Sequence, residues 1–177
     1  MPIVAVFGGS QIEPESVDYE LAVQVGQLLS EAGFGIATGG YYGIMEAALK
    51  GAFVSNSDCI GVTTNYFKNR EKNKFVKTEI RTETYLNRLE KLIDIADGYI
   101  IFPGGTGTLL ELAAVWTLRF RGVTNKPIAC VGEQWQEVIQ TMCFYSEKTI
   151  EEIPLLSHFE EAKDAADFII NQLKNNN

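Results

Sequence analysis

The sequence predicts an α/β protein with one open, doubly wound parallel sheet that is covered by helices on both faces. Runs of strand-like residues alternate with segments of helical periodicity, and the short links between them favour a parallel sheet with right-handed crossovers. Several of these runs are continuously apolar, as in strands buried on both faces. The chain has 177 residues and 46% of them are hydrophobic, which is enough to fill the core of one domain. We expect this domain to cover residues 1–174 and residues 175–177 to form a frayed tail.

The individual elements follow from the spacing of apolar residues along the chain. Residues 3–7 (IVAVF) form an apolar, β-branched run that predicts a buried first strand. Apolar residues then recur at helical spacing over residues 16–32, and Gly33 stands where such a helix would end. The remaining predicted elements are strands at 34–38, 59–63, 75–81, 99–102 and 127–131, and helices at 43–54, 84–96, 108–120, 134–146 and 160–173.

The composition excludes several classes of function. The 23 acidic and 15 basic side chains give a net charge of −8, which argues against binding to a nucleic-acid backbone. The single histidine, His158, rules out a metal site built from several histidines, and we expect it to be a surface or loop residue. The three cysteines show no CxxC spacing, and the apolar start lacks a preceding basic segment, which favours a strand over a signal peptide. We therefore expect a cytoplasmic protein with no metal, no cofactor, no nucleic-acid partner and no membrane anchor.

Three predicted strands run directly into glycine-rich turns, with the sequences FGGS (7–10), TGGYYG (38–43) and PGGTGT (103–108). In a parallel sheet these turns lie at one edge. Glycine lets the backbone approach a ligand closely, and a helix that begins after such a turn directs free N–H groups toward an anion. We interpret the three turns as a phosphate-binding cradle, although a tight strand-to-helix turn would explain any one of them alone. The candidate binding residues are Ser10, Gly39, Gly40, Gly104, Gly105, Thr106, Gly107 and Thr108.

The cradle does not match the common nucleotide-binding motifs. A P-loop requires GxxxxGK[ST], and none of the three turns has a lysine in that register. A dinucleotide site requires GxGxxG after the first strand and an acidic residue at the end of the second strand, which here ends in Thr38. The turns therefore favour a single phosphate group over ATP, GTP or NAD.

Glu111 and Arg88 are the candidate catalytic residues. In a helix that begins near Thr108, Glu111 lies in the first turn and leans toward the glycine turn. From the spacing alone, a capping box with Thr108 explains Glu111 at least as well. A carboxylate repels a neighbouring phosphate, however, so its place there makes more sense if positive charge develops nearby during a reaction. Arg88 lies at the border of an apolar helical stripe, where an arginine is usually a surface residue.

The charge distribution favours a functional role for Arg88. Residues 68–91 carry eight basic and four acidic side chains, whereas the segments on either side are acidic. One basic segment in an acidic chain can attract a small anionic ligand.

Two of the motifs resemble those of the LOG proteins, which are cytokinin-activating phosphoribohydrolases often mislabelled lysine decarboxylases. PGGTGTLLE at 103–111 resembles their PGGxGTxxE motif, and TGGYYGIMEAALKGA at 38–52 resembles TGGGPGIMEAAxxGA. The resemblance implies a Rossmann-like homodimer that hydrolyses the N-glycosidic bond of adenine-type nucleoside 5′-monophosphates, N6-substituted ones included. It implies Arg88 and Glu111 as catalytic residues, residues 104–108 as the phosphate loop and Thr117 as a further substrate contact. A decarboxylase is excluded because no lysine lies in the three turns to hold pyridoxal phosphate.

The chain departs from the LOG pattern at two places. Leu89 follows Arg88 where the family commonly has lysine, and Tyr41 and Tyr42 replace small residues of the second motif. The two rings could stack on a base, narrow the pocket or pack against a neighbouring subunit. Helix 108–120 is apolar around its axis, which predicts either burial on both sides within one subunit or a two-fold dimer interface. The alternative functions are a non-catalytic carrier of a nucleotide or molybdenum cofactor, and an interaction module that binds no phosphate.

Overall fold

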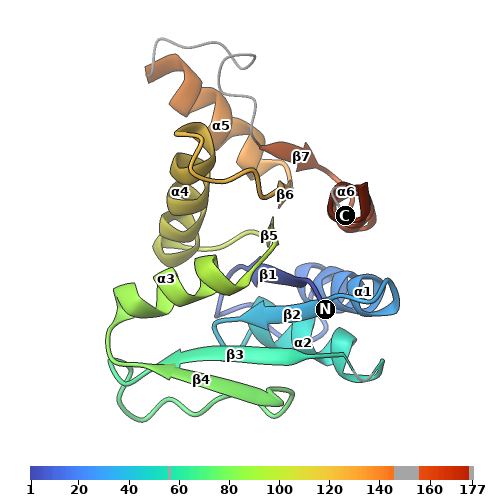
Figure 1. The fold of residues 1–177 in the computed structure, drawn as a ribbon, viewed down its shortest axis with the longest axis vertical. Coiled ribbons are helices and arrows are strands. Elements are labelled where there is room, and N and C mark those ends of the chain that lie inside the picture. Colours follow the sequence, from blue (N-terminus) through green and yellow to red (C-terminus); the bar gives the residue numbers. More distant parts are fainter. Residues whose placement is uncertain (56, 146–155, 176–177) are drawn as a thin grey trace.

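The computed structural model describes residues 1–55, 57–145 and 156–175, and its strands form one parallel sheet with helices on both faces (Figure 1). The strands are β1 (Ile3–Phe7), β2 (Gly35–Thr38), β3 (Cys59–Thr64), β4 (Thr78–Thr82), β5 (Gly98–Ile101), β6 (Ile128–Val131) and β7 (Ser157–Phe159). The helices are α1 (Val17–Glu31), α2 (Ile44–Phe53), α3 (Tyr85–Ile95), α4 (Thr106–Phe120), α5 (Gln134–Tyr145) and α6 (Ala162–Asn175).

The order of the strands in the sheet is β4-β3-β2-β1-β5-β6-β7. The chain first builds outward from β1 through β2 and β3 to β4, and then crosses to β5 on the other side of β1. In the register between β1 and β5, Val4 lies opposite Gly98 and Phe7 opposite Ile101. The order therefore reverses between β1 and β5, and ligands of such sheets bind beyond the carboxyl ends of the strands at this point.

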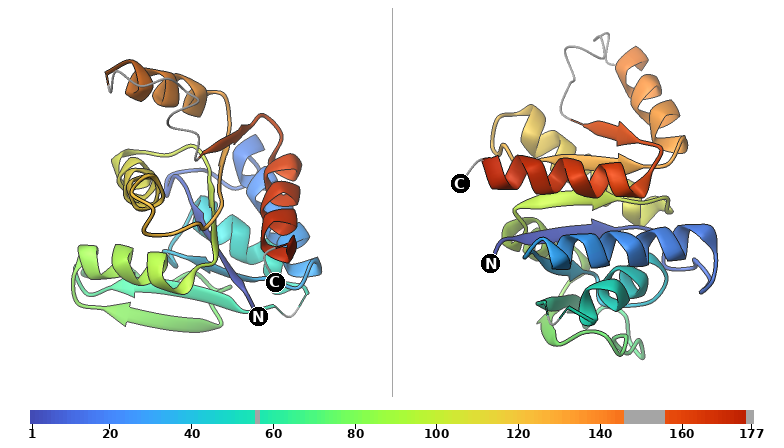
Figure 2. Two further views of the ribbon diagram at one scale, coloured as in Figure 1. Left: turned by 45° about the horizontal axis from the view of Figure 1, so that its top comes forward. Right: turned by 90° about the vertical axis from the view of Figure 1, so that its right-hand side faces the viewer.

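The helices form two layers, with α1, α2 and α6 on one face of the sheet and α3, α4 and α5 on the other (Figure 2). Successive side chains of β1 enter the two cores in turn. Val4 and Val6 pack in the core beneath α1, α2 and α6, whereas Ala5 and Phe7 pack in the core beneath the other three helices. The continuous apolar run of the first strand is thus explained by burial on both faces.

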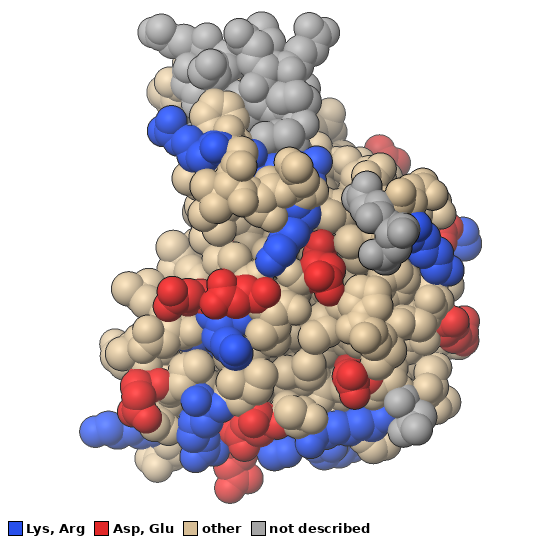
Figure 3. Space-filling view, in the orientation of Figure 1, with Lys and Arg blue, Asp and Glu red and all other residues tan. Residues whose placement is uncertain are grey.

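The polar and charged residues of the basic segment lie at one edge of the sheet. The edge strand β4 has the sequence TEIRT and is only partly buried, whereas β1, β2, β3, β5 and β6 are buried. Figure 3 shows Lys and Arg side chains along the lower edge of the molecule, where Figure 1 shows β4, with Asp and Glu among them. Apart from Arg88 and Lys91 on α3, the basic side chains of residues 68–91 belong to β4 and to the segment that precedes it.

The predicted fold class is confirmed, and several details of the prediction are wrong, among them the helix predicted at 160–173, which is α6 at Ala162–Asn175. Strand β7 is absent from the prediction, and His158 lies in it rather than in a loop, with Nε2 2.9 Å from the carbonyl oxygen of Gly132. Helix α4 begins at Thr106, two residues before the predicted start. The short strand expected at 75–81 is β4, which begins only at Thr78. Residue 146 of one predicted helix and residues 176–177 of the expected tail lie outside the described residues, while Asn175 is the last residue of α6.

Candidate functional site

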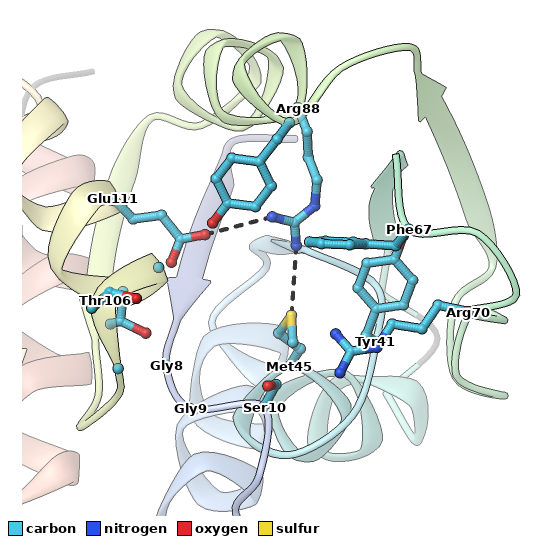
Figure 4. A pocket seen from close by; sticks show the side chains of 14 residues that line it. Gly8, Gly9, Ser10, Tyr41, Met45, Phe67, Arg70, Arg88, Thr106 and Glu111 are labelled. Atoms are coloured by element: carbon cyan, nitrogen blue, oxygen red, sulfur yellow. Dashed lines mark hydrogen bonds and ion pairs between the residues drawn. The ribbon is translucent and has the colours of Figure 1, made fainter. Parts of the chain in front are cut away.

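A cavity of about 250 Å³ opens at the carboxyl edge of the sheet, where the strand order reverses. Its walls come from the loops after β1, β2 and β5, from the segment between β3 and β4, from the first turns of α2 and α3, and from the first two turns of α4 (Figure 4). The lining residues are Gly8, Gly9, Ser10, Tyr41, Met45, Phe67, Arg70, Tyr85, Arg88, Gly105, Thr106, Gly107, Thr108 and Glu111. Both predicted catalytic residues and most of the predicted cradle therefore meet in one cavity.

Arg88 is a buried residue in the wall of this cavity, and several contacts fix its side chain. Its side chain is only 5% exposed, and its Nε–H donates a hydrogen bond to the carbonyl oxygen of Val62 at 2.8 Å. Nη2 lies 3.7 Å from Sδ of Met45, and Cζ lies 5.6 Å and 5.8 Å from the ring centroids of Tyr41 and Tyr85. These contacts leave several guanidinium N–H groups without a strong acceptor among the described residues, which suits the binding of an anion.

Gly39 makes room for the guanidinium of Arg88. A Cβ atom at Gly39 would overlap Nη2 of Arg88 and come within 2.7 Å of Sδ of Met45. Any larger residue would therefore displace the arginine. Neither Gly39 nor Gly40 lines the cavity, so their role as ligand contacts stays a prediction.

Glu111 faces Arg88 across the cavity, and Oε1 lies 3.8 Å from Nη1 of Arg88 (Figure 4). The residue is only 8% exposed, and this burial raises the pKa of its carboxyl to about 7, against the opposing effect of Arg88. Such a carboxyl exchanges a proton readily near neutral pH.

The capping-box explanation of Glu111 fails, because α4 starts earlier than predicted. The N-cap of α4 is Gly105, which places Thr108 inside the first turn and Glu111 in the second. The first turn of α4 contains no acidic residue, and Gly105 has no side chain to cap the helix. Helix capping therefore does not account for a buried carboxylate at this position.

The first turn of α4 offers donors to an anion. The amide groups of Thr106, Gly107 and Thr108 have no acceptor within the helix, as at the start of any α-helix. The loop after β1 is fixed beside them, because Gly9 donates a backbone hydrogen bond of 2.8 Å to the carbonyl oxygen of Pro103. Ser10 extends this wall of the cavity. Amides at a helix start together with a nearby arginine form a suitable site for a phosphate group.

The segment between β3 and β4 supplies residues that the sequence did not single out. The guanidinium of Arg70 lies 5.6 Å from the ring of Tyr41 and 5.5 Å from the ring of Phe67. Phe67 in turn makes edge contacts with Tyr41 and Tyr85. The only sequence signal for this wall was the excess of basic residues at 68–91, which includes Arg70.

Two further predicted contact residues, Gly104 and Thr117, are not among those that line the cavity. Thr117 is exposed on α4 and does not line it. Gly104 instead lines a neighbouring cavity of about 440 Å³ together with Gly105, Thr106 and Trp135. The loop after β5 is thus a wall shared by two cavities.

The described ranges hold neither a candidate metal cluster nor a candidate membrane-spanning helix. No group of three or more His, Cys, Asp or Glu side chains there is placed to hold a metal ion. No helix in the same part of the chain is long and apolar enough to cross a membrane.

The SLOG cluster4 family model matches residues 1–158, which is most of the chain. The chain belongs to the SLOG cluster4 family. The LOG resemblance of the glycine motifs is confirmed, since several relatives of this SLOG cluster4 chain carry that name. The chain is 33% identical over 114 residues to a cytokinin riboside 5′-monophosphate phosphoribohydrolase of Mycobacterium tuberculosis. This match covers 63% of this chain and 61% of that protein. It is 27% identical over 156 residues to the Mycobacterium marinum protein of the same name, covering 82% and 83%.

A third relative of this SLOG cluster4 chain is the Escherichia coli pyrimidine/purine nucleotide 5′-monophosphate nucleosidase. The identity is 36% over 118 residues, but the match spans 62% of this chain and only 26% of that larger protein. Among solved structures, the molybdenum cofactor binding protein of Rippkaea orientalis has a TM-score of 0.77 at 24% identity and covers 97% of both chains. The molybdenum cofactor carrier protein of Chlamydomonas reinhardtii has a TM-score of 0.72 at 20% identity, over 98% of both chains. At these identities the structural likenesses establish the fold.

The residues at which this SLOG cluster4 chain departs from the LOG motifs lie in different environments. Tyr41 is buried, its hydroxyl lies 3.2 Å from the amide nitrogen of Thr64, and its ring packs near Arg88. Leu89 is 8% exposed and packs inward beside Arg88. Tyr42, by contrast, is 47% exposed. Tyr41 therefore narrows the cavity and supports Arg88, whereas Tyr42 does neither.

Proposed function

We propose that this chain hydrolyses the N-glycosidic bond of purine nucleoside 5′-monophosphates, adenine-type and N6-substituted ones included, to the free base and ribose 5-phosphate. The observation that carries this proposal is the buried carboxyl of Glu111, 3.8 Å from Arg88 and one turn beyond the free amides of α4. The names of the mycobacterial and E. coli relatives support the same class of reaction.

The phosphate of the substrate binds the amides of Thr106, Gly107 and Thr108, with the hydroxyl of Ser10 nearby. Arg88 adds a fixed positive charge to the same cavity. This arrangement holds the ribose ring beside Glu111, and it favours a phosphorylated substrate over the free nucleoside.

Glu111 then assists the cleavage itself. As the bond between C1′ and the base breaks, its electron pair leaves with the base and the ribose gains oxocarbenium character. The ionised carboxylate of Glu111 stabilises this positive charge and orients a water molecule toward C1′. The water adds to C1′ and passes a proton to Glu111, which returns it to the departing base. A carboxyl with a pKa of about 7 suits both steps of this transfer.

Apolar side chains on α4 support the assembly of two subunits. Leu109, Leu110 and Phe120 are all exposed on this helix, at 47%, 41% and 38%. A two-fold homodimer would bury this surface. We propose such a homodimer, acting in the cytoplasm, where the free cysteines Cys59, Cys130 and Cys143 stay reduced.

The test is incubation with AMP and with N6-substituted AMP, with the free base measured by chromatography. We expect release of base by the wild-type protein and none by Glu111→Ala or Arg88→Ala. An exposed residue on α3 offers a matched control, Glu90→Ala. Turnover that survives in both site variants would refute the catalytic assignment. No turnover together with micromolar binding of a phosphorylated ligand would instead favour a carrier, which the replacement of the family's lysine by Leu89 also favours.

A further inference from the structure

The hydroxyl group of Tyr85 is an unused donor in the cavity. Tyr85 is the first residue of α3 and precedes Arg88 by one helical turn, so both side chains reach the same cavity. Its ring makes an edge contact with Phe67, with 5.7 Å between the ring centroids, and its centroid lies 5.8 Å from Cζ of Arg88. No hydrogen bond joins its hydroxyl to any described residue, and the partly buried side chain lines the cavity, so the hydroxyl is available to a ligand.

The hydroxyl lies against the start of α4. A Cβ atom at Gly107 would come within 3.0 Å of the Tyr85 hydroxyl oxygen. Gly107 is the second residue of α4, and its amide is one of those that have no acceptor within the helix. The phenol is thus close to the place where an anion would bind to this helix.

The charges around the phenol keep it a hydrogen-bond donor. Burial raises the pKa of Tyr85 above its ordinary value, Glu111 raises it further, and Arg88 opposes this rise. The group is therefore a neutral phenol at physiological pH, with a proton to donate. The Tyr85 ring lies 5.8 Å from the guanidinium of Arg88, which forms an ion pair with Glu111.

We propose that Tyr85 is a phosphate-binding residue, whose hydroxyl donates a hydrogen bond to the phosphate group held by the first turn of α4. The assignment deepens the proposed function and rests on it for the position of the phosphate. It adds to the backbone amides a side-chain donor that a ligand without phosphate does not engage.

The test is the substitution Tyr85→Phe, which removes the hydroxyl and keeps the ring against Arg88 and Phe67. Binding of ribose 5-phosphate is measured by titration calorimetry. A hydrogen bond to a charged group predicts an affinity about tenfold or more below that of the wild type. Binding of adenosine, which lacks phosphate, is expected to be unchanged. Tyr42→Phe is the matched control, because Tyr42 is exposed and does not line the cavity.

The outcomes separate this proposal from the proposed function. If wild-type protein releases no base from AMP, the hydrolase proposal fails, while weaker ribose 5-phosphate binding by Tyr85→Phe still supports the role of Tyr85. Equal binding by wild type and Tyr85→Phe overturns that role even in an active enzyme, and so does a wild-type protein that does not bind ribose 5-phosphate. An equal loss for ribose 5-phosphate and adenosine would mean that Tyr85 only positions Arg88. Should Tyr85→Phe fail to fold, Tyr85→Leu also lacks the hydroxyl and is expected to show the same loss.

Discussion

Replacing Glu111 by glutamine should stabilise the folded chain at alkaline pH while abolishing its activity. The ionised carboxylate of Glu111 is buried, and burial disfavours its charge more than Arg88 favours it, so its pKa rises to about 7 from an ordinary value of 4.5. Glutamine has nearly the same shape and carries no charge. The variant should therefore resemble the protonated form of the wild-type residue at every pH.

The expected magnitude follows from these two pKa values. Because the folded chain binds the proton more tightly than the unfolded chain, the wild type loses stability as pH rises from about 4.5 to about 7. The difference between the two pKa values corresponds to about 3 kcal/mol of unfolding free energy. The stability of Glu111→Gln relative to wild type should thus increase by about 3 kcal/mol between pH 4.5 and pH 8.

The assay is urea denaturation of both proteins across this pH range, followed by circular dichroism. Glu90→Gln, on the exposed side of α3, controls for the loss of one carboxyl group. The reasoning is refuted if the difference between Glu111→Gln and wild type does not change with pH, or if it changes in the opposite direction.

Three further predictions concern the same site and the surface of α4. The kcat/KM for AMP should rise with pH through about 7 and then level, because Glu111 accepts a proton only when ionised; a profile that falls over this range contradicts its role as a base. Gly39→Ala should abolish base release and lower the melting temperature, because its Cβ would overlap Arg88. Gly105→Ala is the control and should leave the melting temperature unchanged, because its Cβ meets no atom within 4 Å. Equal melting temperatures of the two variants would count against the close packing of Gly39 and Arg88. Leu110→Asp should convert a homodimer to monomers in sedimentation velocity, and a monomeric wild type would disprove the dimer.

The fold could be predicted because its strongest signals are local. Continuous apolar runs such as residues 3–7 exist only where both faces of a strand are covered, and the glycine turns mark the strand ends. Strand β7 was missed because its three residues, one of them His158, have neither an apolar run nor a clear alternation. Its strand structure comes from pairing with β6, which is a tertiary interaction.

The site was only partly predictable, for two physical reasons. Glycine has a low helix propensity, so the sequence PGGTGT does not predict a helix that contains Gly107. The predicted start of α4 is therefore two residues late, which places Glu111 in the first turn and not in the second. The wall formed by Phe67 and Arg70 lies in a polar segment without periodicity. Only the folding of this segment over the end of β2 brings it to Tyr41, and no spacing in the sequence encodes that approach.

The two arginines of the cavity, Arg88 and Arg70, differ in how much conformational entropy their side chains lose when a ligand binds. Arg88 has its rotamers fixed when the chain folds, by Val62, Met45 and the two tyrosine rings. A long side chain that is free in solution loses up to about 2 kcal/mol of conformational entropy when it is ordered. A ligand that contacts Arg88 avoids most of this loss. A ligand that recruits Arg70, which is exposed and contacts the rings of Tyr41 and Phe67, must order more of its side chain. Recognition through Arg88 is therefore preorganised, and ligands that differ only in their contact with Arg70 should differ mainly in binding entropy.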